Sequence, residues 1–319
     1  MSRSFSKGPP MSRRKKGLDI SGWLILDKPV GVTSTHAVSK ARWLYQAKKA
    51  GHAGTLDPLA SGILPIAFGE ATKTVPFVMD GEKEYRFEVL WGVETDSDDA
   101  EGAPVATSEN RPGREAIEAA LPAFIGSISQ IPPKFSALKV NGERAYDLAR
   151  DGEEVILEPR IVDITRLELV DMPSADRAVF ECECGKGTYV RAIARDLGRA
   201  LDTRAHVVAL RRTAVGAFTE DDAVSLEELE RLRAEPSADK DIAQALLPVE
   251  TALDDIPALA VNRAEAARLL NGQPVLLRGR DAPTHRGPVS VTTDGALIAL
   301  GEIDRGELHP RRIFHLDRP

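Results

Sequence analysis

One short segment, residues 51–73, concentrates residue types that could carry chemistry. Within it Asp57 stands directly before Pro58, and a residue that precedes proline is restricted to extended backbone, which holds the carboxylate outside a helix. The leucines and isoleucines on both sides would partly desolvate this carboxylate and hold it in place, as a nucleophile or a general base requires. Taken alone, an Asp-Pro pair is more simply interpreted as a turn.

His52 belongs to the same segment, where Gly51 and Gly54 bracket it. These glycines permit a tight backbone path and the close approach of another chain. By itself, His52 is more simply a loop histidine whose ring is satisfied by an ordinary hydrogen bond. Neither His52 nor Asp57 alone decides the chemistry of the segment.

The run at residues 51–60, GHAGTLDPLA, resembles the signature of the TruB family of tRNA pseudouridine synthases. The resemblance implies a pseudouridine synthase fold and the isomerisation of uridine to pseudouridine at position 55 in the T loop of tRNA. Similar blocks cover most of the chain: 26–29 with Gly31 and Ser34, 83–86, 130–133 with 136–139, 185–191, 205–207 with 210–212, and, more weakly, 301–304 with 310–312.

The resemblance implies roles for individual side chains. Asp57 is the nucleophile, which attacks C1′ or C6 of the target nucleotide, or assists departure of uracil and leaves a glycal; the sequence leaves these routes open. Tyr85 would stack on the extruded base, with a part in proton transfer also open, and Tyr189 would line the same pocket. His52 would fill the space that the flipped nucleotide leaves, and Lys28 would contact the pocket or the phosphate backbone.

Arg191 resembles the family's arginine that pairs with the catalytic carboxylate. It comes near the start of a helix predicted at 189–201, where the helix dipole disfavours a cation and a carboxylate neighbour would offset that effect. Arg195 and Arg199 follow at four-residue spacing on the same stripe, and they face either RNA phosphates or water. Leu210, in one of the matching blocks, is assigned to substrate binding.

Cofactors and metals are not expected. The isomerisation involves no redox or phosphoryl-transfer step, and neither G-x-G-x-x-G after a strand nor G-x-x-x-x-G-K-S/T is present. The acidic residues at 94–101 lack the ligand spacing of a calcium loop, so they are interpreted as solvated loop residues. Cys182 and Cys184 share one face of a predicted strand and are interpreted as two small buried residues.

The overall composition is that of an ordinary globular protein, with 42% hydrophobic and 29% charged residues among 319. A net charge of −7 argues against a general nucleic-acid coat protein, so any RNA site must be a local basic surface on an acidic body. No apolar stretch has membrane-spanning length and the N-terminus lacks the pattern of a secretory signal. We therefore expect a cytoplasmic protein without membrane contact.

Strands and helices are mixed without regular βαβ alternation, which favours an α+β fold. The family resemblance implies, in addition, a mixed, largely antiparallel sheet flanked by helices. Ser34 is predicted to cap the first helix, and 50–58 and 94–110 are predicted loops. Strands are predicted at 23–26, 84–91, 155–170, 178–184 and 206–215, and helices at 34–45, 113–124, 144–150, 189–201 and 263–270.

Three parts of the chain are expected. Residues 1–17 form a disordered basic tail, solvated in the simpler interpretation and in contact with RNA phosphates in the alternative. Residues 18–250 form the catalytic domain, because the polar stretch 234–241 indicates a boundary before Pro257. Residues 251–319 form a small β-rich domain that resembles a PUA domain and would extend the RNA contact toward the acceptor arm.

The expected partner is the T stem-loop of tRNA, recognised mainly by shape, and the protein is expected to be a monomer. Two alternatives stay open. A non-catalytic tRNA-binding and folding module is disfavoured by the joint presence of Asp57, Tyr85 and Arg191. A synthase that depends on a guide RNA is disfavoured by the short C-terminal region.

Overall fold

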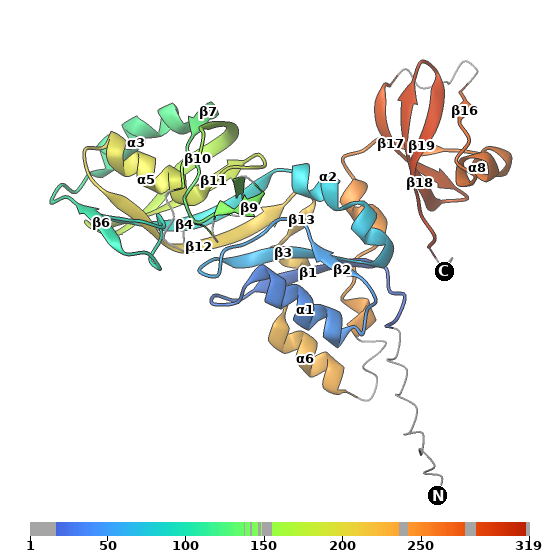
Figure 1. The fold of residues 1–319 in the computed structure, drawn as a ribbon, viewed down its shortest axis with the longest axis horizontal. Coiled ribbons are helices and arrows are strands. Elements are labelled where there is room, and N and C mark those ends of the chain that lie inside the picture. The colour runs from blue at the N-terminus through green and yellow to red at the C-terminus, as the bar shows by residue number, and fades with distance from the viewer. Residues whose placement is uncertain are drawn as a thin grey trace, which may run out of the picture.

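The computed structural model describes residues 17–136, 138–140, 142–145, 148, 155–235, 242–277 and 285–316. Within these ranges a ten-stranded mixed sheet forms the body of the molecule, and a five-stranded sheet forms a separate lobe that includes the C-terminal residues (Figure 1). The protein therefore has the predicted α+β fold with a β-rich C-terminal part. The predicted tail lies outside the described residues, apart from Gly17.

The large sheet has the strand order β14-β1-β3-β12-β4-β11-β10-β7, with β2 on β3 and β13 on β12. Its pairs are antiparallel except for β1 with β14 and β3 with β12. Its strands are β1 (Gly22–Lys28), β2 (Ala50–His52), β3 (Ser61–Phe68), β4 (Lys83–Trp91), β7 (Gly126–Gln130), β10 (Arg160–Ser174), β11 (Arg177–Cys184), β12 (Ala205–Val215), β13 (Phe218–Thr219) and β14 (Val224–Ser225). Two small hairpins accompany it: β5 (Val93–Thr95) with β6 (Pro104–Thr107), and β8 (Lys139–Val140) with β9 (Glu143–Arg144).

Helices pack against this sheet and close its core. In Figure 1, α1 and α6 lie beside β1 and β3, whereas α3 and α5 lie at the β10 and β11 end. One continuous core joins both groups, with Phe87 of β4 stacked on Phe180 of β11 at 5.4 Å between ring centroids. The helices are α1 (Ser34–Leu44), α2 (Val75–Asp80), α3 (Arg114–Ala120), α5 (Val190–Ala200) and α6 (Leu226–Ala234), with short 3₁₀ turns η1 (Gly69–Lys73), η2 (Leu121–Phe124), η3 (Glu220–Asp222) and η4 (Val249–Leu253).

The C-terminal lobe has the order β15-β17-β18-β19-β16. It is attached to the body by polar contacts at its last strand: Lys73 donates to the Ile313 carbonyl at 2.7 Å, and Glu70 accepts from the His315 N–H at 2.7 Å. An apolar cluster that contains both Trp23 and Phe314 spans the junction. The elements are β15 (Ala258–Ala260), α8 (Arg263–Leu270), β16 (Val275–Leu276), β17 (Gly287–Thr293), β18 (Ala296–Asp304) and β19 (Glu307–Ile313).

None of the helices in the described ranges is both long enough and apolar enough to span a membrane.

Some predicted elements differ from the observed ones. The cap of α1 is Thr33, whose hydroxyl accepts from the His36 N–H, while Ser34 is the first helical residue. The strand predicted at 155–170 is β10, which begins later, at Arg160. Part of the loop predicted at 50–58 forms β2, which pairs with β3. The helix predicted at 144–150 lies mostly outside the described residues, and Arg144 itself ends β9.

Candidate active site

The loop that carries Asp57 connects β2 to β3 and is held on both sides. The Ser34 hydroxyl, at the start of α1, accepts from the Leu56 N–H and donates to the Leu56 carbonyl, both at 2.9 Å. The Gly31 N–H donates to the Pro58 carbonyl at 2.8 Å. Leu56 is buried, whereas the Asp57 side chain is 35% exposed. The backbone is therefore anchored while the carboxylate stays accessible at an edge.

Arg191, at the start of α5, is the ion-pair partner of this carboxylate. Its Nη2 lies 2.8 Å from Asp57 Oδ2, and its Nη1 lies 3.2 Å from Asp99 Oδ2. The guanidinium also donates to the carbonyls of Ser97 at 2.7 Å and Phe135 at 2.9 Å. Two carboxylates thus offset the cost of placing a buried cation at the positive end of a helix. The contact with Asp99 was not predicted.

Asp57 and Arg191 lie at a cavity of about 280 Å³, near the lower end of the usual size of ligand pockets, ~300–1,000 Å³. Lys83 and Lys186 also line it, but both have partners: buried Lys83 donates to the Met79 and Gly81 carbonyls, and Lys186 pairs with Asp80 at 2.8 Å. Five of the seven predicted site residues line this cavity: Asp57, Tyr85, Tyr189, Arg191 and Leu210.

Arg212 supports the cavity from β12 and was missed as a site residue. It is 1% exposed, and its guanidinium donates to the carbonyls of Ile63 at 2.7 Å and Gly54 at 3.2 Å. The Tyr85 side chain, opposite Arg212 in the β4–β12 register, also hydrogen-bonds to it. Burial raises the pKa of Tyr85, and the charge of Arg212 opposes this shift. Arg212 thereby joins Tyr85 to the loop that precedes Asp57.

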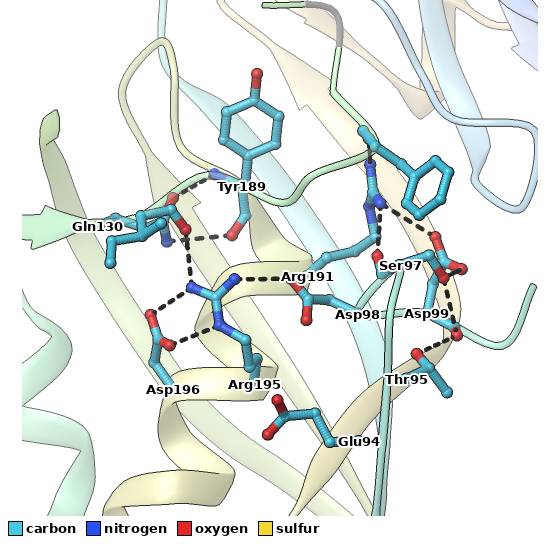
Figure 2. A network of polar contacts seen from close by, with 12 residues as sticks. Glu94, Thr95, Ser97, Asp98, Asp99, Gln130, Tyr189, Arg191, Arg195 and Asp196 are labelled. Carbon is cyan, nitrogen blue, oxygen red and sulfur yellow. Dashed lines mark hydrogen bonds and ion pairs between the residues drawn. The ribbon is translucent and has the colours of Figure 1, made fainter. Parts of the chain in front are cut away.

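Tyr189, the residue that precedes α5, is positioned through its backbone. The buried Gln130 side chain accepts from the Tyr189 N–H at 2.9 Å and donates to the Tyr189 carbonyl at 3.2 Å (Figure 2). This two-point contact fixes the ring at the cavity wall without using its hydroxyl. Burial raises the pKa of that hydroxyl. Gln130 stands in one of the blocks that carry the family resemblance, but its contact with Tyr189 is long-range.

The acidic segment after β4 contradicts, for three of its five acids, the prediction that they are solvated. Glu94, Asp98 and Asp99 are buried. Arg195 pairs with Asp98 at 2.8 Å, and Arg199 pairs with Glu94 at 2.6 Å. The arginine stripe of α5 therefore faces the β5–β6 hairpin. The sequence left RNA phosphates or water as the surroundings of Arg195 and Arg199, and neither describes these ion pairs.

Comparison with known proteins identifies the family of this chain. Residues 42–190 match the N-terminal domain of the TruB family pseudouridylate synthases, residues 191–254 the tRNA pseudouridylate synthase B C-terminal domain, and residues 257–314 the pseudouridine synthase II TruB C-terminal domain. A protein of Bradyrhizobium diazoefficiens named tRNA pseudouridine synthase B is 64% identical over 97% of this chain and 90% of its own length. A protein of the same name in Rhodopseudomonas palustris is 62% identical over 98% and 85%. The chain belongs to the TruB family.

The TruB fold extends to more distant structures. A chain in the crystal structure of a Cbf5-Nop10-Gar1 complex superposes with a TM-score of 0.73 at 25% identity, covering 92% of this chain and 85% of that one. A chain of the archaeal box H/ACA sRNP Nop10-Cbf5 complex gives 0.71 at 24% identity, covering 92% and 86%. The architecture is thus retained where most residues differ.

Two predicted site residues of this TruB-family chain do not line the cavity. His52 lies in β2 opposite Ile66, and its buried Nδ1 has no hydrogen-bond partner in the described part of the chain. Burial and the charge of Arg212 lower the pKa of His52. Lys28 is fully buried and donates to the carbonyls of Pro29 at 2.9 Å and Val32 at 2.7 Å. It therefore holds the turn after β1, close enough to Asp57 for their charges to interact.

The two cysteines are free and buried, as predicted. Within the ranges that the structure describes, no three His, Cys, Asp or Glu side chains are grouped to hold a metal ion. The acids nearest the cavity are instead neutralised by arginines.

Proposed function

We propose that this protein isomerises uridine to pseudouridine at position 55 in the T loop of tRNA, with Asp57 as the nucleophile. The observation that carries the proposal is the pairing of Asp57 with the buried Arg191 at 2.8 Å, at a cavity that Tyr85 and Tyr189 also line. Curated relatives named tRNA pseudouridine synthase B support a tRNA substrate.

The reaction breaks the N1–C1′ bond, turns the base, and forms a C5–C1′ bond, with the C5 proton lost and N1 protonated. Asp57 either bonds covalently to the nucleotide or assists departure of uracil. Arg191 favours the ionised carboxylate and fixes its direction, because an opposite charge within hydrogen-bond distance stabilises the charged form. No redox or phosphoryl-transfer step occurs, so the proposal includes no cofactor and no metal.

The target base must leave its stack to reach Asp57, as bases do for enzymes that act on them. Tyr85 offers a face on which the extruded base can stack, which is worth about 1–3 kcal/mol per base. Lys186, whose side chain is exposed beside the cavity, would attract a backbone phosphate. We assign His52 to filling the space left by the flipped nucleotide and Lys28 to supporting the pocket, with Leu210 and Tyr189 as substrate contacts.

The domain roles follow from the same proposal. Residues 18–250 would carry the catalytic site, and residues 251–319 would form a PUA-like domain that contacts the tRNA beyond the T stem-loop. The basic tail at 1–17 would be solvated. We propose a monomer that works in the cytoplasm.

A tritium-release assay tests the function. A T-arm transcript with C5-tritiated uridine is incubated with the protein alone, and release of the label is measured against the Asp57→Asn variant. A transcript with cytidine in place of the target uridine is the substrate control. Release without added RNA or protein would support a stand-alone synthase. Tight binding without release would favour a tRNA-binding module, and release only with an added RNA would favour a guided enzyme.

A further inference from the structure

Two arginines one turn apart on α5 form ion pairs with two consecutive aspartates. Arg191 contacts Asp99 at 3.2 Å, and Arg195 contacts Asp98 at 2.8 Å. Both arginines also donate to the segment after β7: Arg191 to the Phe135 carbonyl at 2.9 Å and Arg195 to the Ile131 carbonyl at 2.8 Å. In Figure 2 the Arg195 guanidinium faces Asp98 and Asp196, whereas the Arg191 guanidinium lies farther along, at Asp99. The second arginine thus repeats, one turn away from the cavity, the pattern of the first.

The Arg195–Asp98 pair is costly to bury. Both residues are less than a tenth exposed, and taking two charges out of water consumes much of what their attraction provides. Asp98 also adopts a φ of 60°, which an L-residue with a side chain rarely takes. Such a pair contributes little to stability. Its presence is better explained if it fixes the position of a neighbouring group.

The neighbouring group is Asp99. The backbone of Asp98 is tied to β12, because its carbonyl accepts from the Val207 N–H at 3.1 Å, and its side chain is tied to α5 through Arg195. With both ends held, Asp99 has little freedom to move relative to Arg191. The Ser97 carbonyl, on the other side of Asp98, also binds Arg191.

We propose that Arg195 and Asp98 are positioning residues: their ion pair holds Asp99 and the 131–135 segment against Arg191, so that its guanidinium points at Asp57. This inference rests on the proposed function. It predicts that the pair acts on the reaction rate through Arg191 alone. Displacement of a catalytic group by about 1 Å can cost 10²-fold in rate.

The next arginine of the stripe provides a matched control. Arg199 is half exposed and pairs with Glu94 through both its Nε and Nη2. In the described residues it makes no hydrogen bond to the 131–135 segment. Arg199→Gln therefore removes an arginine from the same helix face and leaves the Arg195–Asp98 pair in place; the contact that it shares with Arg195 in the described residues is Asp196, at 3.8 Å from Arg199.

The experiment measures single-turnover tritium release and tRNA affinity for Arg195→Gln and Arg199→Gln, well below the unfolding temperature of each variant. We expect Arg195→Gln to lower the rate by about 10- to 100-fold and the affinity by less than about threefold, whereas Arg199→Gln changes neither by more than about twofold. Arg195→Lys keeps the positive charge but loses the planar two-point hydrogen bonding of the guanidinium, so its single-turnover rate should lie between those of wild type and Arg195→Gln.

A second background distinguishes positioning from a general structural role. In an Arg191→Lys background, adding Arg195→Gln should lower the rate by less than about threefold, because effects along one chain of contacts are non-additive. An equal loss in both backgrounds, or a wild-type rate for Arg195→Gln, would overturn the inference. If Arg195→Gln does not fold, the double variant Asp98→Asn/Arg195→Gln replaces it, since it leaves no unpaired buried charge.

Failure of this inference is distinguishable from failure of the proposed function. If the wild-type protein releases no tritium from the T-arm transcript, the proposed function is wrong, and release by Asp57→Asn at the wild-type rate would exclude Asp57 as the nucleophile. If Asp57→Asn is inactive while Arg195→Gln is fully active, only the positioning role is wrong.

Discussion

The guanidinium of Arg191 lies 2.8 Å from the carboxylate of Asp57, yet the two side chains differ sharply in exposure, at 4% and 35%. The cation is therefore fixed inside the protein while the anion faces the cavity. A substrate that enters can contact Asp57 without displacing Arg191, whose other donors are already used by Asp99, Ser97 and Phe135. This division of roles makes the two residues separable by mutation.

Replacing Asp57 by asparagine should abolish turnover, by more than about 10³-fold, while tRNA still binds within several-fold of wild type. The amide has nearly the same shape as the carboxylate but is neither an anion nor a nucleophile. Tritium release and filter binding measure the two effects. Turnover at the wild-type rate in this variant would rule out Asp57 as the nucleophile.

Replacing Arg191 by lysine should lower the single-turnover rate by about 10- to 100-fold and the affinity by less than about threefold. A point charge on a flexible stem cannot span Asp57, Asp99 and two carbonyls as the planar fork does. The measurement is the same pair of assays. An unchanged rate would remove Arg191 from the mechanism.

The strongest sequence patterns predicted the elements that position the site. The alternation in β4 and the helical stripe of α5 depend on local periodicity, and both were found almost to the residue. The ends of elements were predicted less accurately. Thr33 and Ser34 are both good helix caps, and only the fold shows that the Ser34 hydroxyl is bonded to Leu56 instead. The predicted strand at 155–170 also began five residues before the observed start of β10 at Arg160.

Long-range pairing explains the rest of what was missed. An acidic stretch alone is usually solvated, and nothing local indicates that Asp98 and Asp99 meet arginines almost a hundred residues later. Arg212 is buried because β3, β4 and β12 are neighbours, a topology that no single strand encodes. The roles of Asp57, Tyr85 and Arg191 came from the family resemblance and remain predictions.

Gly62 should tolerate no side chain. It has a φ of +95°, and a Cβ built on it would lie 2.2 Å from the Arg212 backbone oxygen on the neighbouring strand. We expect Gly62→Ala to lower the free energy of unfolding by about 3 kcal/mol or more, because strain and a backbone clash add. Urea denaturation measures this. Gly51→Ala is the control, since no atom lies within 4 Å of the position that its Cβ would take, and an equal loss in both variants would contradict the explanation.

Lys28 should make the stability of the protein depend on alkaline pH. Burial lowers the pKa of Lys28 to about 8, and the nearby charge of Asp57 opposes this shift only in part. In the unfolded chain the amine keeps its proton up to about pH 10.4. Between these values the unfolded state binds more protons than the folded state, so the contribution of Lys28 to stability rises as the pH rises.

The comparison with Lys28→Met isolates this contribution. The free energy of unfolding of the wild type minus that of Lys28→Met should increase by about 3 kcal/mol from pH 7 to pH 11. Urea denaturation at a series of pH values measures the difference, and Lys49→Met, which removes an exposed lysine, is the control. A difference that stays flat, or falls, over this range would mean that burial does not lower the pKa of Lys28. Lys28 would then present a cation to Asp57 throughout the working range of the enzyme.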